Sequence, residues 1–193
     1  RDRVQSEHRE GEEVSRVMKR HVMVGVGWKG EKTFLQYETC LMVANTQPFA
    51  NWMFYSKIVS EIGRLKPADL VQPVSIVESV LSSIKRGQVI LDGNVDCERV
   101  AQECCSLLMS KQPFFNDYFA VNFVDGQLHS LPCLINEPAI PRRDLLGALL
   151  FRLAVEVPWG HEEEHVIIDA VCAEIASIYS KLPFDELVMN VDY

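Results

Sequence analysis

The stretch YFAVNFVDGQLHSLPCLINEPAIPRRDLLGALLFRLAVEVPW, residues 118–159, decides the fold. Side chains of residues 120–124 fall on alternate faces, with the period of a β-strand. Asp125-Gly126 is the strongest dipeptide signal for a two-residue hairpin turn, so the chain is expected to return as a strand over residues 128–135. The sequence therefore predicts an antiparallel hairpin in this part of the chain.

A helix is expected to follow this hairpin and to pack on the same sheet. A loop bounded by Pro138 and Pro141 comes first, and an apolar helix is predicted from Asp144 to Val157, where Pro158 ends it. Working outward, further helices are predicted over residues 6–19, 49–62, 74–85, 96–111 and 162–181, and further strands over 20–26, 33–38 and 40–44. Lys29-Gly30 is expected to form a turn, residues 64–74 an extended segment broken by prolines, and residues 87–94 a loop or short strand.

This pattern predicts an α+β fold with a mostly antiparallel sheet built from both chain ends and packed helices. Because the middle of the chain is mostly helical, it is interpreted as an inserted external subdomain over residues 63–117. The discontinuous subdomain around it comprises residues 1–62 and 118–193. We therefore expect residues 20–44 and 128–135 to share one sheet.

The charge of the chain limits its partners. Its 193 residues carry a net charge of −8, and the sequence pI is about 5.1. A protein that binds nucleic acid through phosphates needs a basic surface, so little direct DNA binding is expected. No apolar run in the sequence is long enough to span a membrane. Because the chain begins without methionine, we interpret it as a piece of a longer protein.

Six cysteines are present: Cys40, Cys97, Cys104, Cys105, Cys133 and Cys172. Most lie beside apolar residues in predicted strands or helices, whereas the disulfides of small secreted domains join short, loop-rich stretches. We therefore expect buried, reduced thiols in an intracellular protein. The three cysteines between residues 97 and 105 form no CxxC pair, so the sequence does not support a structural zinc site there.

Residues 161–165 read His-Glu-Glu-Glu-His and satisfy the HExxH pattern of zinc proteases. That motif needs both histidines one turn apart on a helix, but His161 follows Pro158-Trp159-Gly160 and is expected to lie at or before the helix start. Three glutamates also suit the positive end of a helix dipole without any metal. A zinc-dependent hydrolase that uses this pair is kept as the alternative function.

A gapped set of residues near both chain ends matches a known pattern. Its members are Val24-Gly25, Gln36, Thr39, Leu41, Asn45-Thr46, Tyr118-Phe119, Gly126, Leu128, Leu131-Pro132, Leu134, the loop prolines Pro138 and Pro141, Phe151-Arg152-Leu153-Ala154, Glu156-Val157 and Trp159. This set resembles the C-terminal dimerisation domain of the eukaryotic MutL homologues, in the first-homologue subunit that the heterodimers of DNA mismatch repair share. Residues 61–112 match only loosely.

The resemblance implies a dimerisation subdomain formed from both ends, with an external subdomain between them. Endonuclease-competent relatives carry DQHAxxExxxxE, whose side chains hold metals at the scissile phosphate. Neither that motif nor the CPxGRP-type motif occurs here, so the resemblance implies a non-catalytic subunit without cofactor or metal. It further implies a nuclear protein that binds peptide motifs of repair factors, including an exonuclease.

Strands 33–38 and 40–44 carry apolar residues on both faces. One face can pack against helices, and the other needs a cover, either local helices or a partner chain. The resemblance favours a second MutL-homologue subunit, with a weak homodimer when the chain is alone. The candidate interface residues are Phe34, Leu35, Gln36, Tyr37, Glu38, Leu41, Val43 and Leu134. A homodimeric scaffold unrelated to repair is the third hypothesis.

Overall fold

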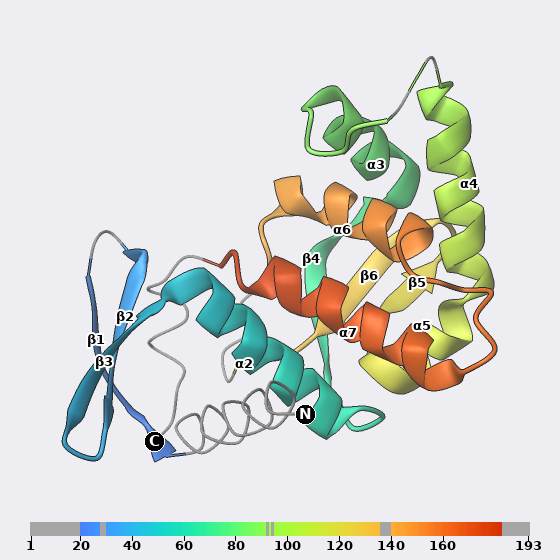
Figure 1. The fold of residues 1–193 in the computed structure, drawn as a ribbon. Coiled ribbons are helices and arrows are strands. Elements are labelled where there is room, and N and C mark those ends of the chain that lie inside the picture. The colour runs from blue at the N-terminus through green and yellow to red at the C-terminus, as the bar shows by residue number, and fades with distance from the viewer. Residues whose placement is uncertain (1–19, 28–29, 92, 94, 136–139, 183–193) are drawn as a thin grey trace, which may run out of the picture. The chain divides into compact units, whose positions relative to one another are not determined.

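The computed structural model describes residues 20–27, 30–91, 93, 95–135 and 140–182 (Figure 1). The chain divides into two compact units at Phe49–Ala50. The predicted helix over residues 6–19, part of the Lys29-Gly30 turn and the tail from residue 183 lie outside the described residues. Within these ranges the chain folds into helices and two small antiparallel sheets, so the α+β prediction is confirmed.

The first sheet is formed by three consecutive strands: β1 (Val22–Gly27), β2 (Lys32–Tyr37) and β3 (Cys40–Asn45). Each lies within two residues of its predicted range. A two-residue turn joins β2 to β3, because Tyr37 pairs with Cys40 and Glu38 adopts a positive φ of 52°. The predicted tight antiparallel unit is therefore confirmed.

The second sheet has the order β4-β6-β5, with β4 at Pro67–Ser75, β5 at Asn122–Val124 and β6 at Gln127–Pro132. Asp125 and Gly126 have φ values of 50° and 73°, and Val124 pairs with Gln127. Positive φ at both central residues is the geometry of a type I′ turn, whose twist matches that of the flanking strands. The predicted Asp-Gly hairpin is confirmed.

The expectation that residues 20–44 and 128–135 share one sheet is wrong, because β6 pairs with β4 and β5 while β1–β3 form a sheet of their own. The partner that the sequence did not reveal is β4, which contains Pro67 and Pro73. Proline is tolerated in a strand only at an edge or a bulge. Here β4 is an edge strand, and its pairing with β6 is interrupted between Asp69 and Val74. The division into residues 63–117 and the remainder stays a prediction.

The described helices are α2 (Thr46–Glu61), α3 (Ile76–Lys85), α4 (Cys97–Ser110), α5 (Gln112–Phe119), α6 (Arg143–Val155) and α7 (Glu164–Tyr179). Of these, α5 was not predicted, because Pro113 was interpreted only as the end of the preceding helix. Proline also suits the first turn of a helix, where no backbone N–H is needed, and Pro113 lies in the first turn of α5. The helix ends at Ala120, whose φ of 54° is left-handed, so β5 starts two residues later than predicted.

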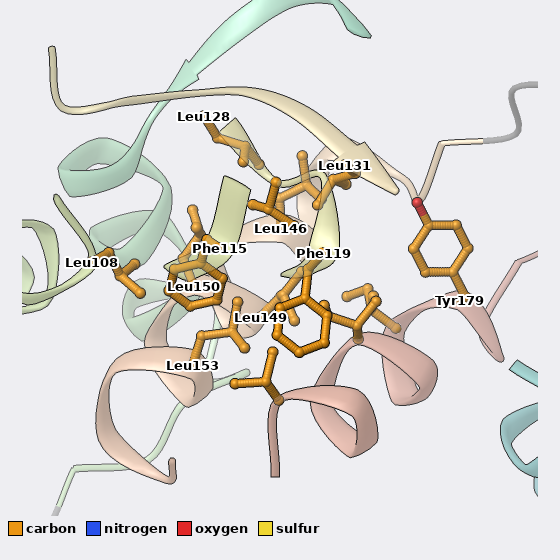
Figure 2. Packing of buried hydrophobic residues seen from close by; sticks show 14 of the residues in the cluster. Leu108, Phe115, Phe119, Leu128, Leu131, Leu146, Leu149, Leu150, Leu153 and Tyr179 are labelled. Atoms are coloured by element: carbon orange, nitrogen blue, oxygen red, sulfur yellow. The ribbon is translucent and has the colours of Figure 1, made fainter. Parts of the chain in front are cut away.

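The core of the second unit packs α5, α6 and α7 around the β5–β6 hairpin. Figure 2 shows Phe115, Phe119, Leu128, Leu131, Leu146, Leu149, Leu150 and Leu153, all at most 1% exposed. Tyr179 is also fully buried, and its hydroxyl donates a hydrogen bond to the carbonyl oxygen of Pro132. Because a buried hydroxyl needs a partner, this bond fixes the end of α7 to the end of β6.

Candidate functional site

One face of the first sheet is apolar and open to solvent. Residues directly opposite each other in an antiparallel pair lie on the same face, so Phe34 and Val43 share a face, as do Gln36 and Leu41. Val22 joins them, because it pairs with Gln36. We call this surface the open face; its residues are Val22, Val24, Phe34, Gln36, Leu41 and Val43.

A β-bulge places Val24 on the open face. Met23 pairs with Leu35, but the next paired residue of β1 is Gly25, which lies opposite Phe34. The two residues Val24 and Gly25 therefore lie across from the single residue Phe34. A Cβ at Gly27 would lie 2.9 Å from Phe34 Cε2, so the Phe34 ring extends along the sheet over this glycine. The Phe34 ring therefore links the apolar side chains of β1 and β3 across the central strand, and Gln36 is the polar residue of this face.

The exposures on this face are high for apolar residues: Val22 is 52% exposed, Val24 57%, Leu41 65% and Val43 58%. On the opposite face Leu35 and Thr33 are only 2% and 1% exposed, and Met42 of β3 is 39% exposed. The Thr33 and Thr46 hydroxyls form a 2.8 Å hydrogen bond there. Adjacent exposed apolar side chains on one side of a sheet mark a binding surface more often than single exposed ones do.

The structure brings half of the candidate interface residues together. On the open face lie Phe34, Gln36, Leu41 and Val43; Leu35 and Tyr37 point to the opposite face, Glu38 is in the β2–β3 turn, and Leu134 is 3% exposed in the core of the second unit. Val22 and Val24 were missed. The alternation of β1 with β2 is the signal for Val22, whereas Val24 depends on a bulge that no sequence pattern marks.

The His161–His165 motif does not form the HExxH arrangement. Helix α7 begins at Glu164, so His161 precedes the helix, as predicted. The Glu163 backbone N–H donates to His161 Nδ1 at 3.1 Å, and His165 Nε2 lies 3.5 Å from Glu163 Oε2. Among the described residues, no group of three or more His, Cys, Asp or Glu side chains is placed to hold a metal ion.

The cysteines are free thiols, two of them buried. Burial raises the pKa of Cys104 to about 11 and that of Cys172 to about 12, so both stay protonated and are poor nucleophiles. Cys97, Cys105 and Cys133 are half-buried. Cys40 departs from the expectation of buried thiols, because it begins the edge strand β3 and is exposed.

Within the described part of the chain, the helices are too short or too polar to cross a bilayer. An α+β domain that leaves an apolar sheet face uncovered has the features of an association module. Residues 1–190 match the family described as DNA mismatch repair protein Mlh1 C-terminus, and the chain belongs to this family. The DNA mismatch repair protein Mlh1 of Dictyostelium discoideum is 27% identical over 153 residues, which cover 77% of this chain and 17% of that protein.

Proposed function

We propose that this chain is the dimerisation module of a MutL-type mismatch repair protein and that its open face binds a second MutL homologue. The observation that supports this is the uncovered apolar surface formed by Val22, Val24, Leu41 and Val43, each more than half exposed. Membership of the Mlh1 C-terminus family supports the choice of partner, because the resemblance to MutL dimerisation domains implies association with another MutL homologue.

The apolar surface supplies a useful part of an association energy. Fully burying a Val or Leu side chain contributes about 2 kcal/mol. Because these four side chains are already about half buried, covering them would add about 1 kcal/mol each, or about 4 kcal/mol together. That is a factor of about a thousand in a dissociation constant, and the remaining affinity must come from contacts elsewhere on the two subunits.

In this proposal the module itself is not an enzyme. The sequence lacks DQHAxxExxxxE, and the described histidines and carboxylates form no cluster that could hold catalytic metals. The partner would supply the endonuclease site, while this chain supplies its platform. A nuclear location, the binding of peptide motifs from repair factors such as an exonuclease, and weak self-association of the isolated chain complete the proposal.

Two valines of matched exposure provide the test. Val43 on the open face is 58% exposed, and Val155 at the end of α6 is 57% exposed. We expect Val43→Asp, or Leu41→Asp, to weaken binding of the C-terminal domain of a second MutL homologue at least about thirtyfold, because a carboxylate would be buried without a partner. Val155→Asp should leave the affinity unchanged.

The affinity is measured by calorimetry or surface plasmon resonance with purified domains, and circular dichroism checks that each variant is folded. Equal affinities for Val43→Asp and the wild type would contradict the proposed interface. Failure of the wild type to bind any second MutL homologue would contradict the dimerisation function itself.

A further inference from the structure

A polar groove lies between α3 and α6, entirely within the second unit. Figure 1 shows these two helices packed side by side, and the groove beside them has a volume of about 620 Å³. One wall is the face of α3 that runs from its N-cap Ser75, through Ser79 and Ser82, to Arg86. The other wall is the first turn of α6 together with Arg142. This site is separate from the open face.

The groove is long enough for an extended peptide. From residue 75 to residue 86 the helix rises about 16 Å, at about 1.5 Å per residue. An extended chain advances about 3.3 Å per residue, so about five residues fit along the wall. Gly147 forms the closed side of the groove, because its lack of a side chain lets α6 approach Ser79 and Ser83 directly. The groove therefore has a defined length and a solid floor.

Three arginines surround this groove in a protein whose net charge is −8. The Arg142 guanidinium binds Asp144 through two hydrogen bonds of 3.1 and 2.9 Å. Arg143 Nη1 donates to Gln72 Oε1 at 3.4 Å, a long bond to a neutral acceptor. For Arg86, no ion pair is found among the described residues. Within the described part of the chain, two of the three guanidinium groups are thus not matched by a carboxylate.

We propose that this groove binds a short peptide segment that carries carboxylate or phosphate groups. Arginine recognises both groups through paired N–H donors, and the serine hydroxyls of α3 offer further donors along the same wall. Glu78 and Asp144 also line the groove, so a continuous polyanion such as a nucleic-acid strand would meet repulsion there. None of the described residues that line it is aromatic, so none offers base stacking. The lining therefore suits isolated anionic side chains on a peptide.

The bulge of β4 whose Gln72 contacts Arg143 also exposes an apolar side chain. Between Asp69 and Val74 the strand departs from its pairing with β6, and Val71 in this bulge is 99% exposed. The next residue, Gln72, is the one that accepts a hydrogen bond from Arg143. The proposed peptide therefore carries an apolar residue next to its anionic ones, which would contact this exposed valine when Arg143 holds a neighbouring anionic group.

The test uses three fluorescent hexapeptides in which a valine is flanked by glutamates, by phosphoserines or by glutamines. We expect the glutamate or the phosphoserine peptide to bind the whole chain at least about tenfold more tightly than the glutamine peptide in anisotropy titrations. The ratio between the two anionic peptides shows which source of the anion the groove prefers. Binding should weaken as salt is raised.

Arg86→Glu and Arg143→Glu should each weaken binding of the anionic peptide about tenfold or more, because each replaces attraction by repulsion. Arg64→Glu is the control, because Arg64 is exposed in the same unit outside the groove and donates a hydrogen bond to the Ser60 carbonyl. Arg86→Gln and Arg143→Gln should show smaller losses of peptide affinity and the melting temperature of the wild type. That result would exclude misfolding as the cause of the weaker binding. The proposal would be overturned if the glutamate and glutamine peptides bound equally well, or if Arg64→Glu weakened binding as much as the groove variants. It would also be overturned if a single-stranded oligonucleotide bound more tightly than the peptides at the same arginines.

Discussion

Gly147 is the position where one added methyl group should damage the second unit most clearly. It lies in the second turn of α6, against α3. A Cβ at this residue would lie 2.0 Å from the Ser79 carbonyl oxygen and 2.3 Å from Ser83 Oγ. Non-bonded carbon and oxygen atoms need more than about 3 Å, so α3 and α6 must move apart by about 1 Å.

The cost of that movement can be estimated. Overpacking a dense core costs about 1–3 kcal/mol, and the upper end applies here because one of the two obstacles is a backbone oxygen that cannot rotate away. Replacing a helical glycine by alanine gains about 1 kcal/mol in helix propensity, which offsets part of this cost. Both helices also carry buried core residues, such as Val80 and Leu150, whose packing would loosen. We therefore expect Gly147→Ala to lower the free energy of unfolding by about 2 kcal/mol.

Urea unfolding followed by circular dichroism measures this change. Gly160→Ala is the matched control, because a Cβ there would meet no atom within 4 Å. The control should stay within about 0.5 kcal/mol of the wild type, as most surface substitutions do. A Gly147→Ala protein as stable as Gly160→Ala would refute the close packing of α3 against α6.

Two further changes test other parts of the second unit. Tyr179→Phe removes the hydroxyl that donates to the Pro132 carbonyl, and should lower the free energy of unfolding by about 1–2 kcal/mol in urea titrations, because a buried acceptor loses its donor; an unchanged value would contradict the bond. Desolvation raises the pKa of Glu174 above its usual 4.5, despite the Arg152 guanidinium 2.8 Å away. The folded state therefore binds this proton more tightly than the unfolded state. As the pH rises from about 4.5 through the raised pKa, the free energy of unfolding of the wild type should fall relative to that of Glu174→Gln. A difference in unfolding free energy that stays constant over this pH range would contradict this.

Local signals in the sequence were enough for much of the fold. The Asp125-Gly126 turn is fixed by the conformational preferences of two adjacent residues, so the β5–β6 hairpin could be predicted from the sequence. The pairing of β6 with β4 could not be predicted, because β4 contains Pro73 and its pairing with β6 is interrupted by a bulge at the sheet edge. Helix α5 was missed for a related reason, since Pro113 can either end one helix or begin the next.

The candidate site was predictable in the same partial way. Apolar residues on both faces of β2 and β3 indicated that one face would need a cover, and Leu41 and Val43 are indeed exposed. The packing of the folded chain decides which face of the sheet stays exposed, and the sequence pattern does not reveal it. Leu35 was therefore predicted as an interface residue although it is buried. Leu134 was chosen as part of a predicted strand, but β6 ends at Pro132 and Leu134 is buried in the second unit. The arginine-lined groove was not recognised because Arg86 and Arg142 are 56 residues apart in the sequence.

Cysteine footprinting of the open face tests the central claim most directly. Val43→Cys and Val155→Cys, each introduced with Cys40→Ser, place thiols at positions of 58% and 57% exposure, and mass spectrometry follows the alkylation rate at each one. If a second MutL homologue binds the open face, a saturating amount of its C-terminal domain should slow alkylation at residue 43 about tenfold or more and leave residue 155 unchanged. Equal rates at residue 43 with and without a partner that demonstrably binds would show that the open face is not the interface.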